Sequence, residues 1–274
     1  MPEIALRLEG VSHVFHPGTP NEVRALDAVD LELVRGTLTV VLGTNGSGKS
    51  SLLGAIAGSL ALTGGGVYLD GRDVTPWSEQ RRAHMIGRVF QNPFTGTASD
   101  LSVAENMTLA ARRGGGRWLH RALGAERRPA IREAVAGLGM GLENRLDTPI
   151  ELLSGGQRQA LTVLMATMVR PTLLLLDEHT AALDPRSAER VIRLTREIII
   201  AGGLTTLMVT HSMTQAVQLG DRVLVMHRGR LVYDIAEVRR QRVAEDDLLQ
   251  LFDQLRWADR LDDSAAAMLR RAYV

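Results

Sequence analysis

One short segment of the sequence combines the glycines, the lysine and the hydroxyl that can hold a chain of phosphates. It fits the pattern G-x-x-x-x-G-K-[ST] with the residues Gly43-Thr44-Asn45-Gly46-Ser47-Gly48-Lys49-Ser50. Glycines let successive backbone N–H groups turn inward around phosphate oxygens, and a following helix points its positive end at the same anion. We expect this loop and the adjacent Ser51 to bind a nucleotide, with Lys49 at the β- and γ-phosphates and the Ser50 hydroxyl on Mg²⁺.

A second segment ends an apolar run with two acids. Leu173-Leu174-Leu175-Leu176 is followed directly by Asp177 and Glu178. A strand buried on both faces delivers its last residue to the carboxyl edge of a parallel sheet, where nucleotides bind. We expect Asp177 to hold Mg²⁺ and Glu178 to polarise the water that attacks the γ-phosphate. Because many strands end in an acid, this assignment depends on the phosphate-binding loop upstream.

The first half of the chain has the strand pattern needed to carry that loop. Expected strands lie at residues 4–8, 28–33, 37–42 and 67–69. Residues 17–21 read as a hairpin or loop, and Gly64-Gly65-Gly66 is expected to form a turn. A helix is expected at 50–57, directly after the glycine-rich loop, which is the strand–loop–helix context that this motif requires.

The second half of the chain alternates strands and helices, which predicts a largely parallel sheet in an α/β core. Expected strands lie at 173–176, 205–209 and 223–226, and expected helices at 186–200 and 212–219. Residues 92–170 lack strand signals and are rich in Ala, Arg, Leu and Met, so we expect a mostly helical insert, broken at Gly114-Gly115-Gly116.

After about residue 240 the chain turns helical again. An apolar stripe at helical spacing is expected to pack on the parent domain: Leu248, Leu251, Phe252 and Leu255. We therefore divide the chain into one domain at 1–240, with the helical insert at about 92–170, and a helical tail at 241–274.

Composition excludes several classes of function. The formal net charge of +1 at pH 7 argues against a nucleic-acid binder, which usually has a basic excess. There is no cysteine, so disulfides, thiolate metal sites and thiol nucleophiles are excluded. The N-terminus lacks a basic region followed by an apolar one, so no signal peptide is expected. No apolar run approaches the ~20 residues that span a bilayer, so any membrane role is expected to come through a partner.

One further segment makes a family resemblance definite. Leu153-Ser154-Gly155-Gly156-Gln157 resembles the LSGGQ signature of the ABC ATPase superfamily, and it lies shortly before the apolar strand, where that family places it. Other elements follow in family order: Gln91 resembles the Q-loop glutamine, Asp184 the D-loop aspartate and His211 the switch histidine. Phe15 resembles the aromatic residue that stacks on adenine.

The resemblance covers about residues 4–235 and implies a fold and its ligands. The implied fold is α/β, a P-loop NTPase of the ABC type with a mostly parallel core sheet, an N-terminal antiparallel β region and an inserted helical subdomain. The implied cofactors are ATP and Mg²⁺, with Gln91 also near the metal. The implied assembly is a homodimer, in which each ATP lies between the phosphate-binding loop of one copy and residues 154–157 of the other.

The resemblance also implies a function. The chain would be an ATPase that drives a separate integral membrane permease from the cytoplasmic face of the membrane, with residues around 92–110 as the interface. An extracytoplasmic solute-binding protein would be an indirect partner. In hydrolysis, Glu178 would act as general base or orient the water, and His211 would contact the γ-phosphate. Gln91 would sense the same phosphate.

One departure from the common pattern narrows the match. The segment 177–184 has His179 where most of the superfamily has proline after the glutamate. Together with residues 87–94, it resembles the ATPase subunits of bacterial importers linked to tryptophan and tyrosine uptake. We expect His179 to be a hydrogen-bonding loop residue rather than a metal ligand or base.

Three alternatives differ in class from an importer ATPase. An unfused exporter ATPase keeps all the motifs. A soluble, non-transport ABC ATPase is disfavoured by the single cassette and the absence of a long heptad run. A binding module with a dead site is disfavoured because its residues for hydrolysis are complete: Lys49, Asp177, Glu178 and His211.

Overall fold

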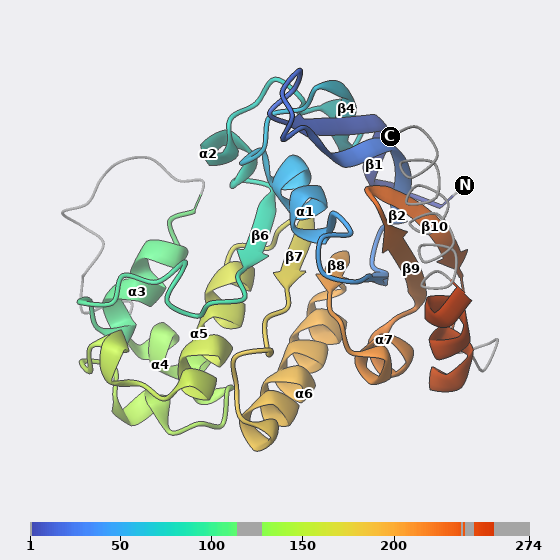
Figure 1. Ribbon diagram of the computed structural model, residues 1–274. Helices are drawn as coiled ribbons and strands as arrows, with labels where there is room; N and C mark the ends of the chain where they lie inside the picture. The colour runs from blue at the N-terminus through green and yellow to red at the C-terminus, as the bar shows by residue number, and fades with distance from the viewer. Residues whose placement is uncertain (1, 114–127, 237, 239–243, 255–274) are drawn as a thin grey trace, which may run out of the picture.

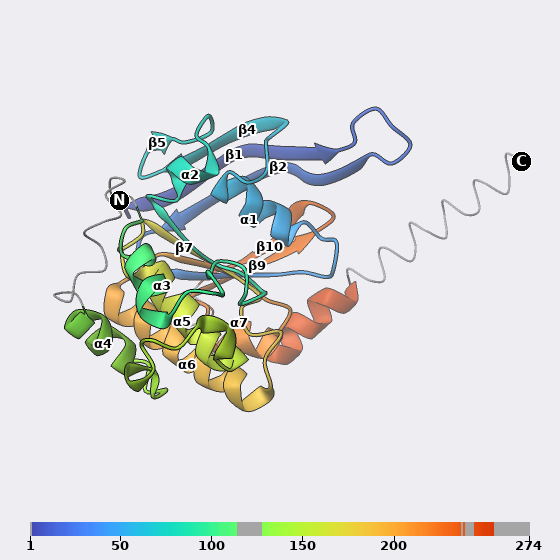
Figure 2. The same ribbon diagram turned by 90° about the vertical axis from the view of Figure 1, so that its left-hand side faces the viewer.

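Two β-sheets with helix α1 (Lys49–Ala57) between them form the core of the molecule (Figures 1 and 2). The computed structural model describes residues 2–113, 128–236, 238 and 244–254. The expected break at Gly114-Gly115-Gly116 therefore lies outside the described residues.

The first sheet is antiparallel and lies over one side of α1. It contains β1 (Ile4–Phe15), β2 (Val23–Val34), β4 (Gly64–Leu69) and β5 (Arg72–Asp73), in the order β2-β1-β4-β5. Apolar residues alternate along β1 and β2 and meet in register, Leu6 with Leu33 and Leu8 with Leu31. All four are buried, because alternation with period two places them on one face of the sheet. The N-terminal antiparallel region is confirmed.

The second sheet carries the expected core strands. Its order is β10-β9-β3-β8-β7-β6, with β3 (Leu38–Leu42), β6 (Ile86–Val89), β7 (Leu173–Asp177), β8 (Thr206–Val209), β9 (Arg222–His227) and β10 (Arg230–Ile235). All neighbours pair in parallel except β10, which is antiparallel to β9. Along β7, Leu173 and Leu175 face α1 and the first sheet, whereas Leu174 and Leu176 face the helices on the other side. Burial on both faces explains the unbroken leucine run.

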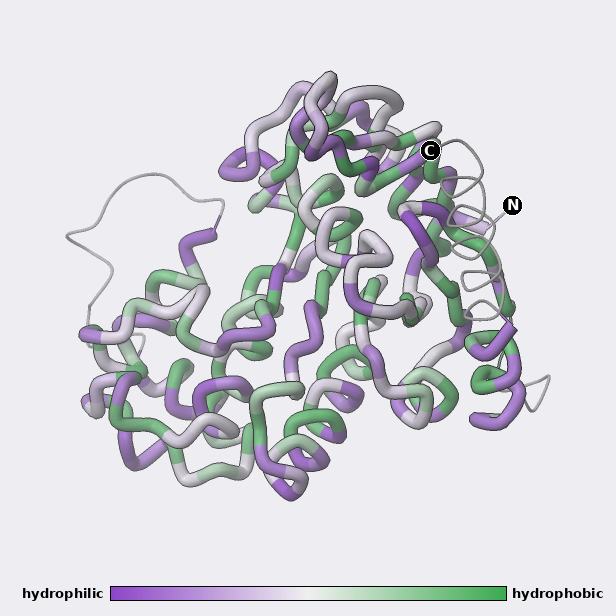
Figure 3. The backbone as a smooth tube through the Cα atoms, viewed as in Figure 1, coloured by the Kyte–Doolittle hydropathy of each residue, from purple (hydrophilic) through white to green (hydrophobic). Residues whose placement is uncertain are grey.

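Most of the remaining helices cover the other face of the second sheet and extend beyond it (Figure 2). They are α3 (Val103–Ala110), α4 (Arg128–Ala136), α5 (Gly155–Thr167), α6 (Pro185–Gly202) and α7 (Met213–Leu219). The short helix α2 (Glu79–Arg82) instead lies beside α1, where Arg82 donates to the carbonyl oxygens of Ala55 and Ile56. Within the expected insert, α3, α4 and α5 share one apolar cluster, to which α6 contributes Val191 and Leu194. Figure 3 shows α6 alternating between hydrophobic and hydrophilic residues, as a helix with one buried face should.

Four strand assignments differ from the sequence expectation. The glycines at 64–66 do not form a turn but begin β4, where Gly66 pairs with Glu9. A side chain at Gly65 would collide with the carbonyl of Glu9, so the glycines allow two backbones to approach closely. Strands β5, β6 and β10 were not predicted, and β5 has only two residues. β6 has only four residues, and β10 alternates between exposed and half-buried residues as an edge strand does.

The C-terminal stripe packs as predicted where it is described. Residues 245–254 are helical, and Leu248 and Phe252 are buried against the second sheet, with Leu251 beside them. Leu255 and the rest of the tail, 255–274, lie outside the described residues. Among the described residues, no helix has the length and hydropathy that a bilayer crossing requires.

Candidate active site

The phosphate-binding loop joins β3 to α1, as predicted, and two of its glycines are required by close contacts. Gly48 has a φ of 107°, and a Cβ there would lie 2.5 Å from the carbonyl oxygen of Ala25. A Cβ at Gly43 would lie 2.6 Å from the carbonyl oxygen of Met226. The loop therefore follows a path that only glycine allows at these points. This path places the N-terminal end of α1 at the loop, where its free N–H groups can bind an anion.

Lys49 is a buried cation at the start of α1. Only 6% of its surface is exposed, and its Nζ donates to the carbonyl oxygens of Gly43 at 2.8 Å and Thr44 at 3.0 Å. Burial lowers the pKa of Lys49, while the charges of Glu178 and Asp177 act in the opposite direction. An ammonium group has three donors, so one remains for an anionic ligand.

A cleft of about 790 Å³ opens in front of this loop. Its size is in the range of cofactor sites. Phe15 lines the cleft and is 39% exposed. Its ring makes an edge-to-face contact with His13 at a centroid distance of 4.4 Å. The cleft brings together residues from the first sheet, from the start of α1 and from four loops that follow strands of the second sheet: Phe15, Val23, Ala25, Asn45, Gly46, Gly48, Lys49, Ser50, Ser51, Gln91, Glu178, Ala181 and His211.

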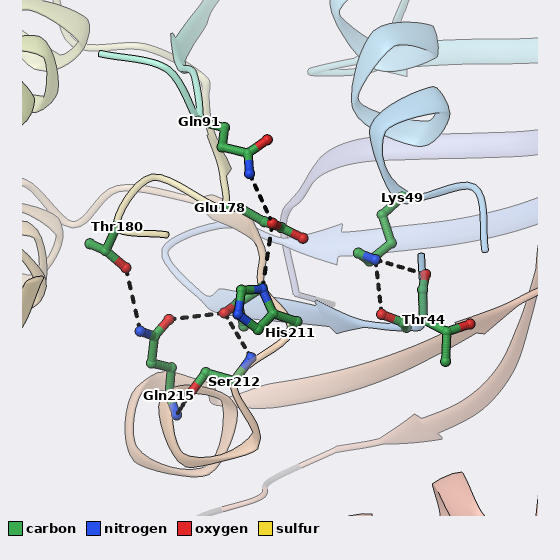
Figure 4. A network of polar contacts seen from close by, with 10 residues as sticks. Thr44, Lys49, Gln91, Glu178, Thr180, His211, Ser212 and Gln215 are labelled. Atoms are coloured by element: carbon green, nitrogen blue, oxygen red, sulfur yellow. Dashed lines mark hydrogen bonds and ion pairs between the residues drawn. The ribbon is translucent and has the colours of Figure 1, made fainter. Parts of the chain in front are cut away.

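Three predicted residues meet at one carboxylate in this cleft. Gln91 donates from Nε2 to Oε2 of Glu178 at 3.3 Å, and Nδ1 of His211 lies 3.5 Å from the same oxygen. Figure 4 shows Glu178 between these two side chains, with Lys49 across the site. Glu178 has a φ of 42°, a conformation that is uncommon for a residue with a side chain and is often found at functional sites.

Asp177 ends β7 and lies close enough to Lys49 for the two charges to act on each other. Burial raises the pKa of Asp177, so its carboxylate is short of solvation. Together with the Ser50 hydroxyl, it offers the hard oxygen ligands that Mg²⁺ prefers. Among the described residues, no three His, Cys, Asp or Glu side chains form a metal cluster.

The signature residues form the start of α5. The Ser154 hydroxyl accepts from the Gln157 N–H, and the Gln157 Oε1 accepts from the Ser154 N–H, which completes a capping box. Side chains at Gly155 and Gly156 would lie 3.2 Å from Leu183 and 3.0 Å from Ser187. The signature therefore packs against the start of α6, which Asp184 caps by accepting from the Ser187 N–H at 3.1 Å. The Ser187 hydroxyl and then its N–H hold the pKa of Asp184 below its usual value by hydrogen bonding to the carboxylate.

The signature does not line the cleft that the phosphate-binding loop forms. The described lining residues include neither 154–157 nor Asp184, although Ser154, Gly155 and Asp184 are exposed. The chain thus presents two separate surfaces that could bind an anion. The first has the loop, Glu178 and His211, and the second has the exposed N-terminal end of α5.

His179 is buried beside the active site, with 2% of its surface exposed. Its Nε2 lies 3.3 Å from the Thr195 hydroxyl on α6, which confirms the expected hydrogen-bonding role. Burial lowers the pKa of His179 to about 4, so the ring is neutral at physiological pH.

Sequence reasoning missed one polar group at the site. Gln215 on α7 lies between the Thr180 and Thr210 hydroxyls, one from the loop after Glu178 and one from the residue before His211. Nothing in the spacing of these residues indicates that they meet, since 35 residues separate Gln215 from Thr180.

Comparison with known proteins gives a consistent assignment. The profile of the family described as ABC transporter matches residues 26–181. The chain is 36% identical to the tyrosine transport ATP-binding protein of Clostridioides difficile over 90% of this chain and 98% of that protein. It is 38% identical to the lipoprotein-releasing system ATP-binding protein LolD 1 of Caulobacter vibrioides, over 85% and 96%.

A solved structure extends the match to the fold. The ATP-binding cassette MJ0796, in a dimeric post-hydrolysis state bound to ADP and Pi, superposes with a TM-score of 0.72 and 27% identity. The superposition covers 84% of this chain and 98% of that one. The phosphate-binding loop, the acids that end β7 and the capped signature helix lie in a fold that this cassette shares. The chain therefore belongs to the ABC transporter family, as one of its ATP-hydrolysing subunits.

Proposed function

We propose that two identical copies of this chain bind two ATP molecules and, by hydrolysing them, drive a separate membrane permease. The observation that carries the proposal is the meeting of Gln91 and His211 at the Glu178 carboxylate, in the cleft that also holds Lys49. In this proposal the loop from Gly43 to Ser51 binds the phosphates, and Phe15 stacks on the adenine ring.

The hydrolytic step follows from these positions. Glu178 orients water for in-line attack on the γ-phosphate and accepts its proton, while Lys49 offsets charge on the phosphate oxygens and His211 contacts the γ-phosphate. Gln91 contacts Glu178 and can thereby report the state of the γ-phosphate to the helical insert. Ser50, Asp177 and Gln91 would hold Mg²⁺. When bound, that ion would neutralise charge on the β- and γ-phosphates.

The proposed dimer completes a site that one copy leaves open. The N-terminal end of α5 is capped but exposed at Ser154 and Gly155. It is absent from the described lining of the chain's own cleft. In a head-to-tail pair, residues 154–157 and Asp184 would close over the ATP held by the partner. ATP would then favour the closed dimer, and hydrolysis would release it.

An apolar groove supports the proposed permease interface. It has a volume of about 350 Å³ and lies between β6, α3 and α5. Leu109, which lines the groove, and Phe94, which precedes it in the chain, are both large exposed apolar residues. Exposed apolar residues beside a groove suit a partner helix laid into it. We assign this groove, which the segment 92–110 lines in part, to the permease.

The proposed cargo is an amino acid or a similar small solute, moved into the cell. The support is the similarity to a tyrosine transport ATP-binding protein, together with the motif variant around His179. An extracytoplasmic solute-binding protein would then be an indirect partner, and the subunit would work at the cytoplasmic face of the membrane. We also retain the division into a domain at 1–240 and a tail at 241–274.

Glu178→Gln tests the hydrolytic proposal. The amide keeps the size of the side chain but cannot accept the proton, so turnover should fall at least about 100-fold. Binding of ATP should be unchanged, and ATP should trap a dimer visible by gel filtration. Glu197→Gln, an exposed position on α6, is the matched control. Near-normal turnover in Glu178→Gln would show that the role assigned to Glu178 is wrong.

Affinity purification tests the transporter proposal. The tagged chain, extracted from its own cell's membranes in mild detergent, should co-purify with a multi-span permease. Leu109→Asp in the groove should weaken that recovery while ATP binding by the purified chain persists. Recovery of soluble partners alone would contradict the assignment of a permease.

A further inference from the structure

Three consecutive residues after β7 each contact a different part of the molecule. The Glu178 carboxylate meets Gln91 and His211 in the cleft. The next residue, His179, is buried against α6. The third, Thr180, accepts a hydrogen bond from Gln215 of α7. The position of Glu178 therefore depends on the contacts that the next two residues make with α6 and α7.

Gln215 joins this loop to the loop that carries His211. Its Nε2 donates to the Thr180 hydroxyl at 3.4 Å, and its Oε1 accepts from the Thr210 hydroxyl at 2.9 Å. Figure 4 shows Gln215 below Thr180 and beside the loop of His211 and Ser212. Both threonines are buried, at 7% and 3% exposure. Hydrogen bonds in such an environment are costly to leave unmade.

The position of His211 depends on its backbone rather than on packing. Its side chain is 64% exposed, so few neighbours restrain the ring. The residue before it, Thr210, is held by Gln215 and also accepts from the Ser212 N–H at 3.1 Å. Fixing Thr210 thus fixes the point from which the His211 side chain starts.

We propose that Gln215 is a positioning residue for ATP hydrolysis. Its side-chain amide holds the loop of Glu178 and the loop of His211 at a fixed spacing. This inference rests on the roles proposed above for Glu178 and His211. Gln215 itself is not among the described residues that line the cleft. It acts through Thr180 and Thr210, and it contributes to the chemical step rather than to ATP binding.

The test compares Gln215→Met with Gln218→Met in the purified full-length chain. Methionine matches the length of glutamine but cannot make either hydrogen bond. Gln218 is an exposed residue of the same helix and controls for effects on α7 in general. Gln215→Met should lower kcat about tenfold, because small displacements of reacting groups are costly. KM for MgATP should stay within about twofold of the parent value, because no contact to the phosphates or to the adenine ring is lost. Gln218→Met should change neither.

A double-mutant cycle distinguishes loss of the Gln215 bridge between Thr180 and Thr210 from a general loss of stability. Thr180→Val and Thr210→Val each remove one end of the bridge. If the amide acts as one unit, adding Thr180→Val to Gln215→Met should cause little further loss of kcat. In the non-hydrolysing Glu178→Gln background, Gln215→Met should leave ATP affinity unchanged.

Several results would overturn the inference. Parent-like kcat in Gln215→Met would do so, as would a fall in ATP affinity parallel to the fall in kcat, or fully additive losses in the cycle. If kcat is normal in Gln215→Met but lost in Glu178→Gln, the positioning role of Gln215 is rejected and the proposed function stands. Normal turnover in Glu178→Gln would reject the role proposed for Glu178, and with it the positioning role of Gln215.

Discussion

The guanidinium carbon of Arg158 lies 3.6 Å from the centre of the Phe94 ring. Arg158 belongs to α5, the signature helix, and is 2% exposed, whereas Phe94 follows Gln91 and is 55% exposed. The next residue of α5, Gln159, donates to the Phe90 carbonyl oxygen at 3.4 Å. Two contacts therefore join the signature helix to the segment around Gln91, so a displacement of that segment would also shift α5.

Phe94→Ala should destabilise the protein because it removes this cation–π contact. The loss in unfolding free energy should be about 1 kcal/mol, the range for a partly desolvated pair. Urea unfolding checks it. Phe94→Trp, which keeps an aromatic face, is the control and should lose less. Equal stability of the alanine and tryptophan variants would show that the contact contributes nothing.

Asp177→Asn should stabilise the nucleotide-free protein while damaging the site. Burial raises the pKa of Asp177, so the ionised carboxylate is unfavourable in the folded state at neutral pH. A neutral amide should increase the unfolding free energy by about 1 kcal/mol. The increase in Tm that MgATP gives over metal-free ATP should disappear. Asp100→Asn, at an exposed position, should change neither quantity. Lower stability of Asp177→Asn without ligand would contradict this account.

The parts of the fold that could be predicted are those that leave a recognisable pattern within a short stretch of sequence. The leucine run of β7 predicts a strand because burial on both faces leaves an unbroken apolar run. The alternation in β1 and β2 predicts strands because burial on one face leaves apolar residues at every second position. The loop at 43–50 could be placed because glycine, lysine and hydroxyl spacing is fixed by the shape of phosphate groups. The Ser154 cap at the start of α5 is a local signal of the same kind, because it depends only on Ser154 and Gln157.

The parts that could not be predicted depend on contacts distant in sequence. Gly64-Gly65-Gly66 reads as a turn, and only its pairing with β1 makes it a strand. Gln91 lies 87 residues from its hydrogen-bond partner Glu178, and their meeting follows from the parallel pairing of β6 with β7. The bridge through Gln215 depends on side-chain direction at the start of a short helix, which no local pattern encodes.

Arg82→Met should cost about 3 kcal/mol of unfolding free energy. The guanidinium of Arg82 is buried and donates to four carbonyl oxygens, those of Ala55, Ile56, Thr75 and Trp77. Two of these belong to the last turn of α1, whose carbonyls have no partner within the helix. Removing the donors leaves buried acceptors unsatisfied. Arg81→Met, an exposed neighbour that stacks on Trp77 at 3.9 Å, should lose under about 1 kcal/mol. Similar losses for the two variants in denaturant unfolding would refute the proposed role of the carbonyl contacts.

His179 should make the stability of the nucleotide-free protein fall as the pH falls below about 6.5. Its pKa is lowered from 6.5 to about 4 by burial, so between these values the unfolded chain binds the proton and the folded chain does not. The stabilisation is therefore complete above pH 6.5 and is lost as the pH falls toward 4. Between pH 7.5 and 5 the loss should be about 2 kcal/mol.

His179→Gln isolates this contribution, because glutamine can still hydrogen-bond to Thr195 but does not titrate. The difference in unfolding free energy between the parent and His179→Gln should shift by that ~2 kcal/mol from pH 7.5 to pH 5, with the parent losing more. His84→Gln, at an exposed position, should follow the parent at both pH values. If His179→Gln also follows the parent, the ring accepts a proton in the folded state, and the neutral, buried histidine described beside Glu178 is wrong.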